Sequence, residues 1–365
     1  MGTYRGVLVG AGGFGGVWAR RFLPVFRDRV KIVGIADLDP TALHSAGDAL
    51  GVPGAARCSS FEGLCAQIEA DVCFLVVPPA VRTEAVRLAS TCGMAVLCEK
   101  PIAASWEQSI EIASRVRESG IKFAVTQNYR QANRIRALKR VLRRPNLGAI
   151  NLLQCRLGVD YTIETAGGAF RHQIPDALIY EGAEHHIDQF RNLLDADGAW
   201  VQGVQWNQPW STFANNCCVA LTVGMANGAV VQYELNHIVR GHQNGWHNEY
   251  YRVECEGGTV TLDGDHVIRI TRRVSDQREE TEEVLPDTDL EDGHFAVING
   301  FLDWLDGGPP PVTVAEDNLR TMALTFAAVE ATHSGHRITV PTLPDWAGGS
   351  TASETAEASL DAATG

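Results

Sequence analysis

Short apolar runs alternate with longer stretches of helical periodicity over the first third of the chain. The apolar runs cover residues 7–9, 30–36, 71–77, 94–98 and 121–125, and a helix is expected from about 105 to 119. Strands that alternate with helices predict a parallel sheet with helices on both faces. Ligands bind such sheets beyond the carboxyl ends of the strands, so the segments that follow these runs are candidate binding loops.

The pattern changes near residue 127. Two pairs of apolar runs are each interrupted by a dipeptide that favours a tight turn: 219–226 and 229–235 around Asn227-Gly228, and 250–255 and 259–262 around Gly257-Gly258. Helices are expected near 295–305 and 315–334. Successive hairpins with two helices predict an α+β region with a large, mostly antiparallel and open-faced sheet.

A glycine-rich turn follows the first apolar run directly. It reads Gly10-Ala11-Gly12-Gly13-Phe14-Gly15, it leads into a helix expected from about 14 to 23, and the next run ends at Asp37. In G-x-G-x-x-G turns the first glycine permits the tight turn, the second lets the backbone approach a pyrophosphate, and the third lets the helix press against the strand. A carboxylate at the position of Asp37 meets the 2′-hydroxyl of the adenosine ribose. This order of elements predicts a Rossmann domain that binds NAD.

The length of the chain allows two hydrophobic cores. For 365 residues we expect two domains, a doubly wound α/β Rossmann domain at 1–126 and the α+β domain at 127–346, which would bind substrate and form subunit contacts. The remaining segment, 347–365, is rich in Gly, Ser, Thr, Ala and Glu and is predicted to be disordered.

Composition excludes several classes of protein. The chain is 45% hydrophobic and 21% charged, and no apolar stretch approaches the roughly 18 residues that span a membrane. The first strand begins almost at the N-terminus, which leaves no room for a signal peptide. The nine cysteines contain no C-x-x-C pair, and several lie inside apolar runs. These features are typical of reduced core cysteines in a cytoplasmic protein.

The charge of the chain argues against nucleic acid as a partner. The net charge is −13, whereas the neutralisation of phosphates needs a basic face. Seven basic residues do gather between Arg130 and Arg144, and such a run is expected to form a solvated helix face.

The first candidate for chemistry is Glu99-Lys100-Pro101, at the end of a predicted core strand. A lysine there would be partly desolvated and close to a bound nicotinamide, where it could take part in proton transfer. The alternative is an ordinary surface lysine at a strand end, and this triplet alone does not decide between the two.

The second candidate is the segment from Glu181 to Asp188, which runs into a predicted helix. Glu181 and His185 are four residues apart and His185 and Asp188 are three apart, so all three are expected on one helix face. A histidine flanked by carboxylates is prepared as a general base, whereas His186 points about 100° away. A metal site is disfavoured because no H-E-x-x-H or third ligand accompanies the pair. A satisfied core histidine remains the alternative.

With these residues in view, the chain resembles the Gfo/Idh/MocA oxidoreductases, which include glucose–fructose oxidoreductase and inositol dehydrogenase. The resemblance extends to about Pro341 and is carried by the glycine turn, Asp37, Pro78-Pro79, Glu99-Lys100-Pro101, Asn128-Tyr129-Arg130, and His185 with Asp188. It implies that Lys100 and His185 are the catalytic pair. The chain departs from the family pattern at three positions, which are Glu181, Ala183 and Arg82. The first departure affects the acid–base relay, and the last is expected to alter contacts to the cofactor or substrate.

The combined interpretation is an NAD-dependent dehydrogenase that oxidises, or reversibly reduces, a secondary hydroxyl of a sugar, sugar derivative or cyclitol. His185 is the leading base, supported by Glu181 and Asp188, and Lys100 binds the reacting hydroxyl and stabilises negative charge on its oxygen. Two alternatives are an NAD-dependent glycoside-processing enzyme, which oxidises and then eliminates, and a non-catalytic sensor of nucleotide or sugar. We expect a homodimer or homotetramer through the C-terminal sheet, with no nucleic acid, membrane or metal as partner.

Contacts to the two ligands follow from these assignments. The expected cofactor contacts are Gly10, Gly12, Gly13, Phe14, Gly15, Asp37, Val77, Pro78, Pro79, Glu99, Lys100, Gln127 and Asn128. The expected substrate contacts are Lys100, Tyr129, Phe170, Arg171 and His185, of which Tyr129, Phe170 and Arg171 rest on the resemblance. The loop 237–247, rich in His, Arg, Asn and Trp, is either a further sugar contact or an exposed interface loop.

Overall fold

The computed structural model describes residues 2–162, 172–288 and 291–347. Residues 348–365, which make up nearly all of the tail predicted to be disordered, lie outside the described residues, as do Phe170 and Arg171.

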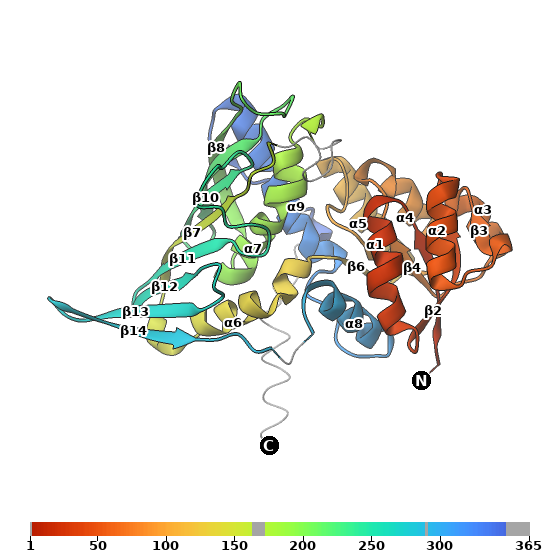
Figure 1. The fold of residues 1–365 in the computed structure, drawn as a ribbon, viewed down its shortest axis with the longest axis horizontal. Helices are drawn as coiled ribbons and strands as arrows, with labels where there is room; N and C mark the ends of the chain where they lie inside the picture. Colours follow the sequence, from red (N-terminus) through yellow and green to blue (C-terminus); the bar gives the residue numbers. More distant parts are fainter. Residues whose placement is uncertain (1, 163–171, 289–290, 348–365) are drawn as a thin grey trace, which may run out of the picture.

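A six-stranded parallel sheet forms the N-terminal part of the protein (Figure 1), as the alternating pattern predicts. Its order is β3-β2-β1-β4-β5-β6, with strands Tyr4–Val9 (β1), Val30–Ala36 (β2), Arg57–Cys58 (β3), Val72–Leu75 (β4), Ala95–Cys98 (β5) and Phe123–Val125 (β6). The order reverses between β1 and β4, which creates the crevice where doubly wound sheets bind their ligands. The short β3 has no apolar run and is not anticipated by the sequence pattern.

Helices cover both faces of this sheet. They are Gly13–Val17 (α1), Pro40–Leu50 (α2), Phe61–Gln67 (α3), Arg82–Thr91 (α4) and Trp106–Ser119 (α5). Helix α5 begins where expected because the Ser105 side chain accepts a hydrogen bond from the Gln108 N–H at 3.2 Å. The helix expected from 14 to 23 is not uniform, since α1 passes into a π-helical turn at Trp18–Phe22 and a 3₁₀ turn at Leu23–Phe26.

A nine-stranded sheet forms the C-terminal part, in the order β14-β13-β12-β11-β7-β10-β9-β8-β15. Its strands are Ile150–Gly158 (β7), Gly198–Trp206 (β8), Cys218–Met225 (β9), Val230–Asn236 (β10), Tyr250–Cys255 (β11), Gly258–Leu262 (β12), Ile268–Ser275 (β13), Arg278–Val284 (β14) and Ile338–Thr339 (β15). Both predicted hairpins, β9–β10 and β11–β12, are present. All neighbours are antiparallel except β7 and β10, so the prediction of a mostly antiparallel sheet is confirmed.

Three helices cover one face of the nine-stranded sheet (Figure 1): Asn133–Leu142 (α6), Glu184–Leu194 (α7) and Ala315–Ser334 (α9). A π-helical turn, Leu178–Ala183, leads directly into α7. Helix α9 also reaches the first sheet, where Leu319 and Met322 are buried with residues of β4, α4 and α5.

Helix α8, Gly293–Leu305, belongs to the C-terminal half of the sequence but packs in the core of the first half. Its buried residues Val297, Ile298, Phe301 and Leu302 share a cluster with Trp18 and with residues of β1, β4 and β5. The two halves of the chain therefore do not fold around separate sets of helices. None of the helices that the structure describes is long and apolar enough to cross a membrane.

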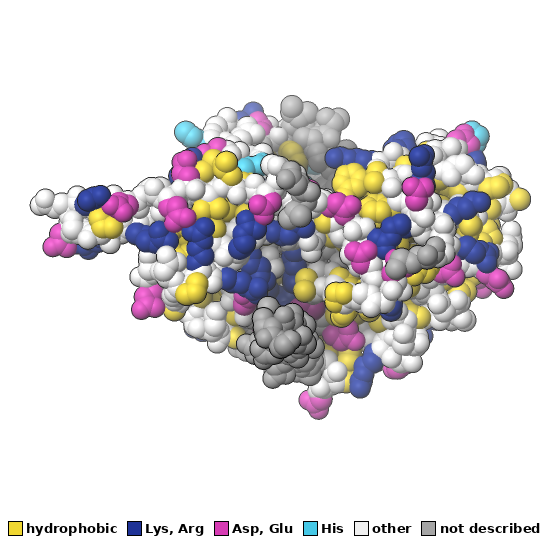
Figure 2. All heavy atoms as spheres, turned by 90° about the horizontal axis from the view of Figure 1, so that it is seen from below, with side chains coloured by type: hydrophobic (Ala, Val, Ile, Leu, Met, Phe, Trp, Pro, Cys, Tyr) yellow, Lys and Arg dark blue, Asp and Glu magenta, His cyan; other side chains and the backbone are white. Residues whose placement is uncertain are grey.

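The basic run from Arg130 to Arg144 is only partly the solvated face that the sequence predicts. Figure 2 shows Lys and Arg side chains gathered on the face seen from below, in the region of α6. Arg140 is exposed and Arg144 half-buried, and they pair with Asp287 and Glu282 at 2.7 and 2.6 Å. Arg130 and Arg134, however, are buried. Their acidic partners lie more than 50 residues further along the chain, so local periodicity gives no sign of this burial.

Arg130 joins three elements through buried charges. Its guanidinium binds both oxygens of Asp188 on α7 at 2.7 Å and lies 3.1 Å from Asp317 on α9. The Thr321 hydroxyl donates a further hydrogen bond to Asp188 at 2.8 Å. This network fixes α7 against α9 and against the turn after β6.

Removal of the Asp188 carboxylate should expose the importance of this network. We expect Asp188→Ala to lower the free energy of unfolding by about 3–5 kcal/mol, because Arg130 would remain buried with only a partial counter-charge. Urea denaturation measures the change. The matched control is Asp287→Ala, which breaks the exposed pair with Arg140 and should cost less than about 1 kcal/mol. Equal losses in the two variants would contradict the assignment.

Candidate active site

Two close backbone contacts shape the glycine-rich turn after β1. Gly10 has a φ of +90°, and a Cβ there would lie 2.3 Å from the carbonyl oxygen of Val76. A Cβ on Gly15 would lie 2.0 Å from the carbonyl oxygen of Gly10. Neither position has room for a side chain. Gly10 thus forms the tight turn, and Gly15 allows the close packing of helix and strand, as the sequence predicts.

Gly12 and Gly13 have a different environment, with open space around them. A Cβ on Gly12 would meet no atom nearer than 3.8 Å, and one on Gly13 would meet none within 4 Å. Both residues and the following Phe14 are exposed where α1 begins. Packing within the protein therefore does not explain a glycine at position 12. Open space at a helix N-terminus suits the pyrophosphate of a dinucleotide, so these residues fit the expected cofactor.

Asp37 lies beside this turn at the end of β2. Its Oδ2 accepts hydrogen bonds from the N–H groups of Ala11 at 2.6 Å and Gly12 at 3.0 Å, and its Oδ1 accepts one from Asp39 at 2.8 Å. These bonds fix the carboxylate at the carboxyl edge of the sheet, in the place where a Rossmann domain binds the adenosine ribose.

Other predicted cofactor residues share this edge. Val77, Pro78 and Pro79 follow β4, and Gln127 and Asn128 follow β6. The Val77 side chain lies 3.0 Å from the position of a Cβ on Gly10, so this segment touches the glycine turn. Gln127 and Asn128 are buried. Their contact with a cofactor stays a prediction.

The Glu99 carboxylate is buried and surrounded by protein donors. It accepts hydrogen bonds from Trp18 Nε1 at 2.9 Å, Thr126 Oγ1 at 2.7 Å and the Lys100 N–H at 3.2 Å, and it lies 3.2 Å from His294 Nε2. Burial opposes the ionisation of Glu99, but the hydrogen bonds with His294 and Thr126 outweigh this effect and lower its pKa. The described contacts of the Glu99 carboxylate are therefore with other groups of the protein. Its contact with a cofactor stays a prediction.

Arg82 holds the same segment through backbone carbonyls. Its guanidinium donates to the carbonyl oxygen of Val77 at 2.9 Å and to those of Glu99 and Pro101, while the carbonyl oxygen of Lys100 lies 3.4 Å away. The side chain is only 3% exposed. The sequence suggested that Arg82 alters contacts to a ligand, whereas the described contacts of its guanidinium are to the protein backbone that carries Lys100.

Lys100 brings the two predicted constellations together. Its Nζ donates a hydrogen bond to the carbonyl oxygen of Glu181 at 2.8 Å, and its side chain is half-buried. The contact joins the carboxyl edge of the first sheet to the π-helical turn before α7. An ammonium group has three donors, so two remain for other partners. Glu181 uses its backbone carbonyl here, and the role predicted for its carboxylate stays a prediction.

Three aromatic rings are stacked beside Lys100. The rings of His185 and Tyr129 lie 4.4 Å apart at 23°, and those of Tyr129 and His247 lie 4.5 Å apart at 28°. Because a ring has two faces, Tyr129 lies between the two imidazoles. The stack places His247, one end of the loop 237–247, against Tyr129, and so this loop reaches the candidate site.

The His185 imidazole is kept neutral by its surroundings. Burial and the nearby positive charge of Lys100 hold its pKa well below the usual value. Its Nδ1 has no hydrogen-bond partner among the described residues. A neutral imidazole can accept a proton at neutral pH, which a general base requires.

The Asp188 carboxylate has other partners, although Asp188 and His185 lie three residues apart within α7 as expected. Its two oxygens bind Arg130 and Thr321 and not His185. The partners in the turn after β6 and on α9 therefore use the carboxylate that was expected to support His185. The π-helical turn ends before His185 and so changes only the phase of Glu181 relative to α7. His186 does point away, as predicted: it is buried, and its Nδ1 lies 2.7 Å from the Tyr233 hydroxyl.

Glu184 was not predicted, yet it is a notable titratable group of the site. It is fully buried, and its Oε1 accepts a hydrogen bond from Gln127 Nε2 at 2.6 Å. Burial raises the pKa of Glu184 to about 7, while the charge of Lys100 opposes the rise. A usable signal was present in the sequence, because Glu184 lies three residues before Ile187 on the buried side of the helix.

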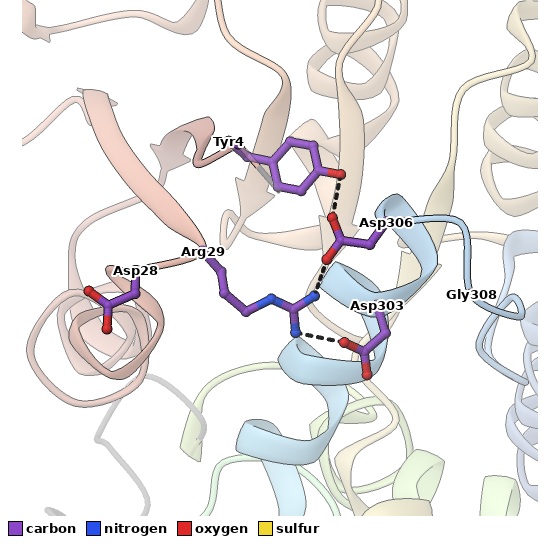
Figure 3. A pocket seen from close by; sticks show the side chains of 7 residues that line it. Tyr4, Asp28, Arg29, Asp303, Asp306 and Gly308 are labelled. Carbon is purple, nitrogen blue, oxygen red and sulfur yellow. Dashed lines mark hydrogen bonds and ion pairs between the residues drawn. The ribbon is translucent and has the colours of Figure 1, made fainter.

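A surface hollow elsewhere does not belong to this site. Figure 3 shows Tyr4, Arg29, Asp303 and Asp306 around it, with the Arg29 guanidinium bound to both aspartates and the Tyr4 hydroxyl bound to Asp306. Tyr4 is the first residue of β1, so the hollow lies at the amino end of the strand and away from the glycine turn.

Comparisons with known proteins agree with this geometry. Residues 4–127 match the profile of the oxidoreductase family with an NAD-binding Rossmann fold, GFO_IDH_MocA, and residues 148–340 match the C-terminal alpha/beta domain of the same family. An uncharacterized protein, y4oX of Sinorhizobium fredii, is 32% identical over 93% of this chain and 96% of its own length.

Two further relatives have named activities. D-apiose dehydrogenase of Paraburkholderia graminis is 22% identical over 93% of this chain and 90% of its own length. The solved structure of a levoglucosan dehydrogenase in complex with NADH has a TM-score of 0.79 and 18% identity, and the match covers 94% of this chain and 100% of that one. The first profile covers the segment of the six-stranded sheet, and the second covers most of the nine-stranded sheet. This chain therefore belongs to the Gfo/Idh/MocA family of oxidoreductases, with an NAD(P)-binding Rossmann domain.

Proposed function

We propose that this protein is an NAD-dependent dehydrogenase that oxidises, or reversibly reduces, a secondary hydroxyl of a sugar, sugar derivative or cyclitol. The contact between Lys100 Nζ and the carbonyl of Glu181, beside a neutral His185, carries the proposal. It brings a cation and a proton acceptor together at the sheet edge that carries the glycine turn. The D-apiose and levoglucosan dehydrogenases support a polyhydroxylated substrate.

Each residue has a defined task in this reaction. When bound, the nicotinamide supplies the hydride acceptor. The His185 imidazole accepts the hydroxyl proton, and Lys100 donates a hydrogen bond from Nζ to the same oxygen as negative charge develops on it. Tyr129 holds the His185 imidazole by stacking on it, and His247 stacks on Tyr129 in turn. Arg82 and Glu99 fix the backbone that presents Lys100.

A homodimer or homotetramer in the cytoplasm remains part of the proposal. One face of the nine-stranded sheet is covered by helices, and its other face is open in Figure 1. Side chains of two adjacent strands meet there, with Gln154 Nε2 bound to Gln232 Oε1 at 2.6 Å. All nine cysteines are free thiols, which is compatible with a reducing compartment.

The test of the proposal is a substrate panel with product analysis. The purified protein, NAD and a set of aldoses, sugar derivatives and cyclitols should give NADH and a ketone or lactone. Release of an aglycone would instead indicate oxidation followed by elimination. NADH binding without turnover on any panel member, in either direction, would favour a sensor and contradict the proposed function.

Cofactor choice should depend on Asp37. Its carboxylate, with Asp39 nearby, repels a 2′-phosphate and binds ribose hydroxyls. We expect Asp37→Ser to raise the use of NADP relative to NAD by about tenfold or more, equivalent to about 1.4 kcal/mol. Steady-state kinetics with both cofactors measure the ratio. A preference of the unmodified protein for NADP would contradict the assignment.

Lys100 should act in the transition state. We expect Lys100→Ala to lower kcat by about 10²–10⁴-fold, because the developing oxyanion would lose its charged donor. NADH affinity, followed by quenching of tryptophan fluorescence, should stay nearly unchanged. A change confined to KM would show that Lys100 only holds the substrate.

The two adjacent histidines provide a matched pair of variants. We expect His185→Ala to lower kcat/KM for oxidation by about 10²-fold and to remove the rise of activity with pH. Because the pKa of His185 is lowered, this rise should lie below pH ~6.5. His186→Ala should reduce stability, since it removes the bond to Tyr233, and should keep the rise. Larger losses for His186→Ala would mean that the roles are reversed.

A further inference from the structure

The buried carboxyl group of Glu184 has an unused oxygen next to the proposed active site. Gln127 Nε2 binds Oε1 at 2.6 Å and so fixes the orientation of the carboxyl group. Oε2 has no hydrogen-bond partner among the described residues. A buried, unpaired carboxyl oxygen is unfavourable. Its presence at this position therefore calls for a functional explanation.

Lys100 is the cation that can approach this oxygen. Its Nζ is bound to the carbonyl of Glu181, three residues before Glu184 in the same helical segment. Its charge acts on Glu184, but among the described residues it makes no ion pair with Glu184, whose Oε1 is bound by Gln127 and whose Oε2 has no partner. Lys100 has two donors left, and Oε2 has no donor. The two groups are thus close but unjoined.

We propose that Glu184 is a positioning residue, which holds Lys100 in one of two places according to its own protonation state. With Glu184 neutral, Lys100 Nζ stays on the Glu181 carbonyl and faces the reacting hydroxyl. With Glu184 ionised, Oε2 attracts Nζ and draws it away from that hydroxyl. This inference rests on the role of Lys100 in the proposed function.

The charges around Glu184 set the direction of the effect. Burial favours its neutral form, and Asp188 on α7 acts in the same direction. Lys100 and Arg82 act in the opposite direction, as does the hydrogen bond from Gln127. The pKa of about 7 places the change from neutral to ionised within the ordinary working range of pH. The oxidation rate should therefore decline above pH ~7.

The first experiment needs no substrate. Carbon-13 NMR of the full chain labelled at glutamate carboxyls should show one group that titrates near pH ~7 and is missing in Glu184→Gln. In Lys100→Met this titration should move to higher pH, because the lysine charge that favours the carboxylate is gone. An unchanged midpoint in Lys100→Met, or the absence of such a group, would overturn the proposal. The Lys100→Met arm leaves Glu184 intact and so does not depend on the folding of Glu184→Gln.

The second experiment measures the pH profile of oxidation. In the unmodified protein kcat should fall by up to about tenfold per pH unit above the midpoint, whereas Glu184→Gln should keep its activity there. Glu111→Gln on α5 is the control, since it removes one exposed carboxylate and should reproduce the unmodified profile. The same decline in Glu184→Gln would overturn the proposal. If no panel substrate reacts, the proposed function fails, whereas the NMR titrations still decide whether Glu184 and Lys100 are coupled.

Discussion

The burial of the Glu99 carboxylate is the constraint on which the candidate site depends. A buried carboxylate must find donors, and this one draws them from Trp18 after α1, Thr126 after β6 and His294 at the start of α8. Arg82 satisfies the backbone carbonyls on the other side of the same segment. Any shift of β5 would leave several of these polar groups unpaired at once. The backbone of Lys100 is therefore held from both sides.

Three polar contacts connect the Rossmann sheet to the segment that leads into α7. Lys100 reaches the π-helical turn before α7, Gln127 reaches Glu184, and Arg130 reaches Asp188. In each pair, a residue at the carboxyl edge of the Rossmann sheet binds a residue between 181 and 188. The position of the helix that carries His185, relative to the carboxyl edge of the Rossmann sheet, thus depends on a few direct hydrogen bonds and ion pairs. Small changes in these contacts would move Lys100 and His185, the groups proposed to act on the substrate, relative to each other.

Much of the fold could be predicted from the sequence because its strands and turns follow from local patterns of apolar and turn-forming residues. The apolar runs of β2 and β10, the Asn227-Gly228 turn and the glycine turn with Asp37 all signal their structure within a few residues. The partners of Asp188 and the burial of Arg134 could not be predicted in the same way. Their partners lie far away in the chain, as Glu249 does for Arg134 and Arg130 does for Asp188. Long-range charge pairing leaves no periodic signal.

The position of α8 limits how freely the two halves of this chain could be exchanged with those of relatives during evolution. Its apolar side completes the core around Trp18, although more than 150 residues of the other half separate it from β6. An exchange of C-terminal halves between relatives would replace α8 as well, and the incoming helix would have to match the foreign core at Val297, Ile298, Phe301 and Leu302. Exchange of halves is therefore restricted at the junction after β6, although the sequence pattern changes there as at a domain boundary. The two halves of the chain are expected to have diverged together as one inherited unit.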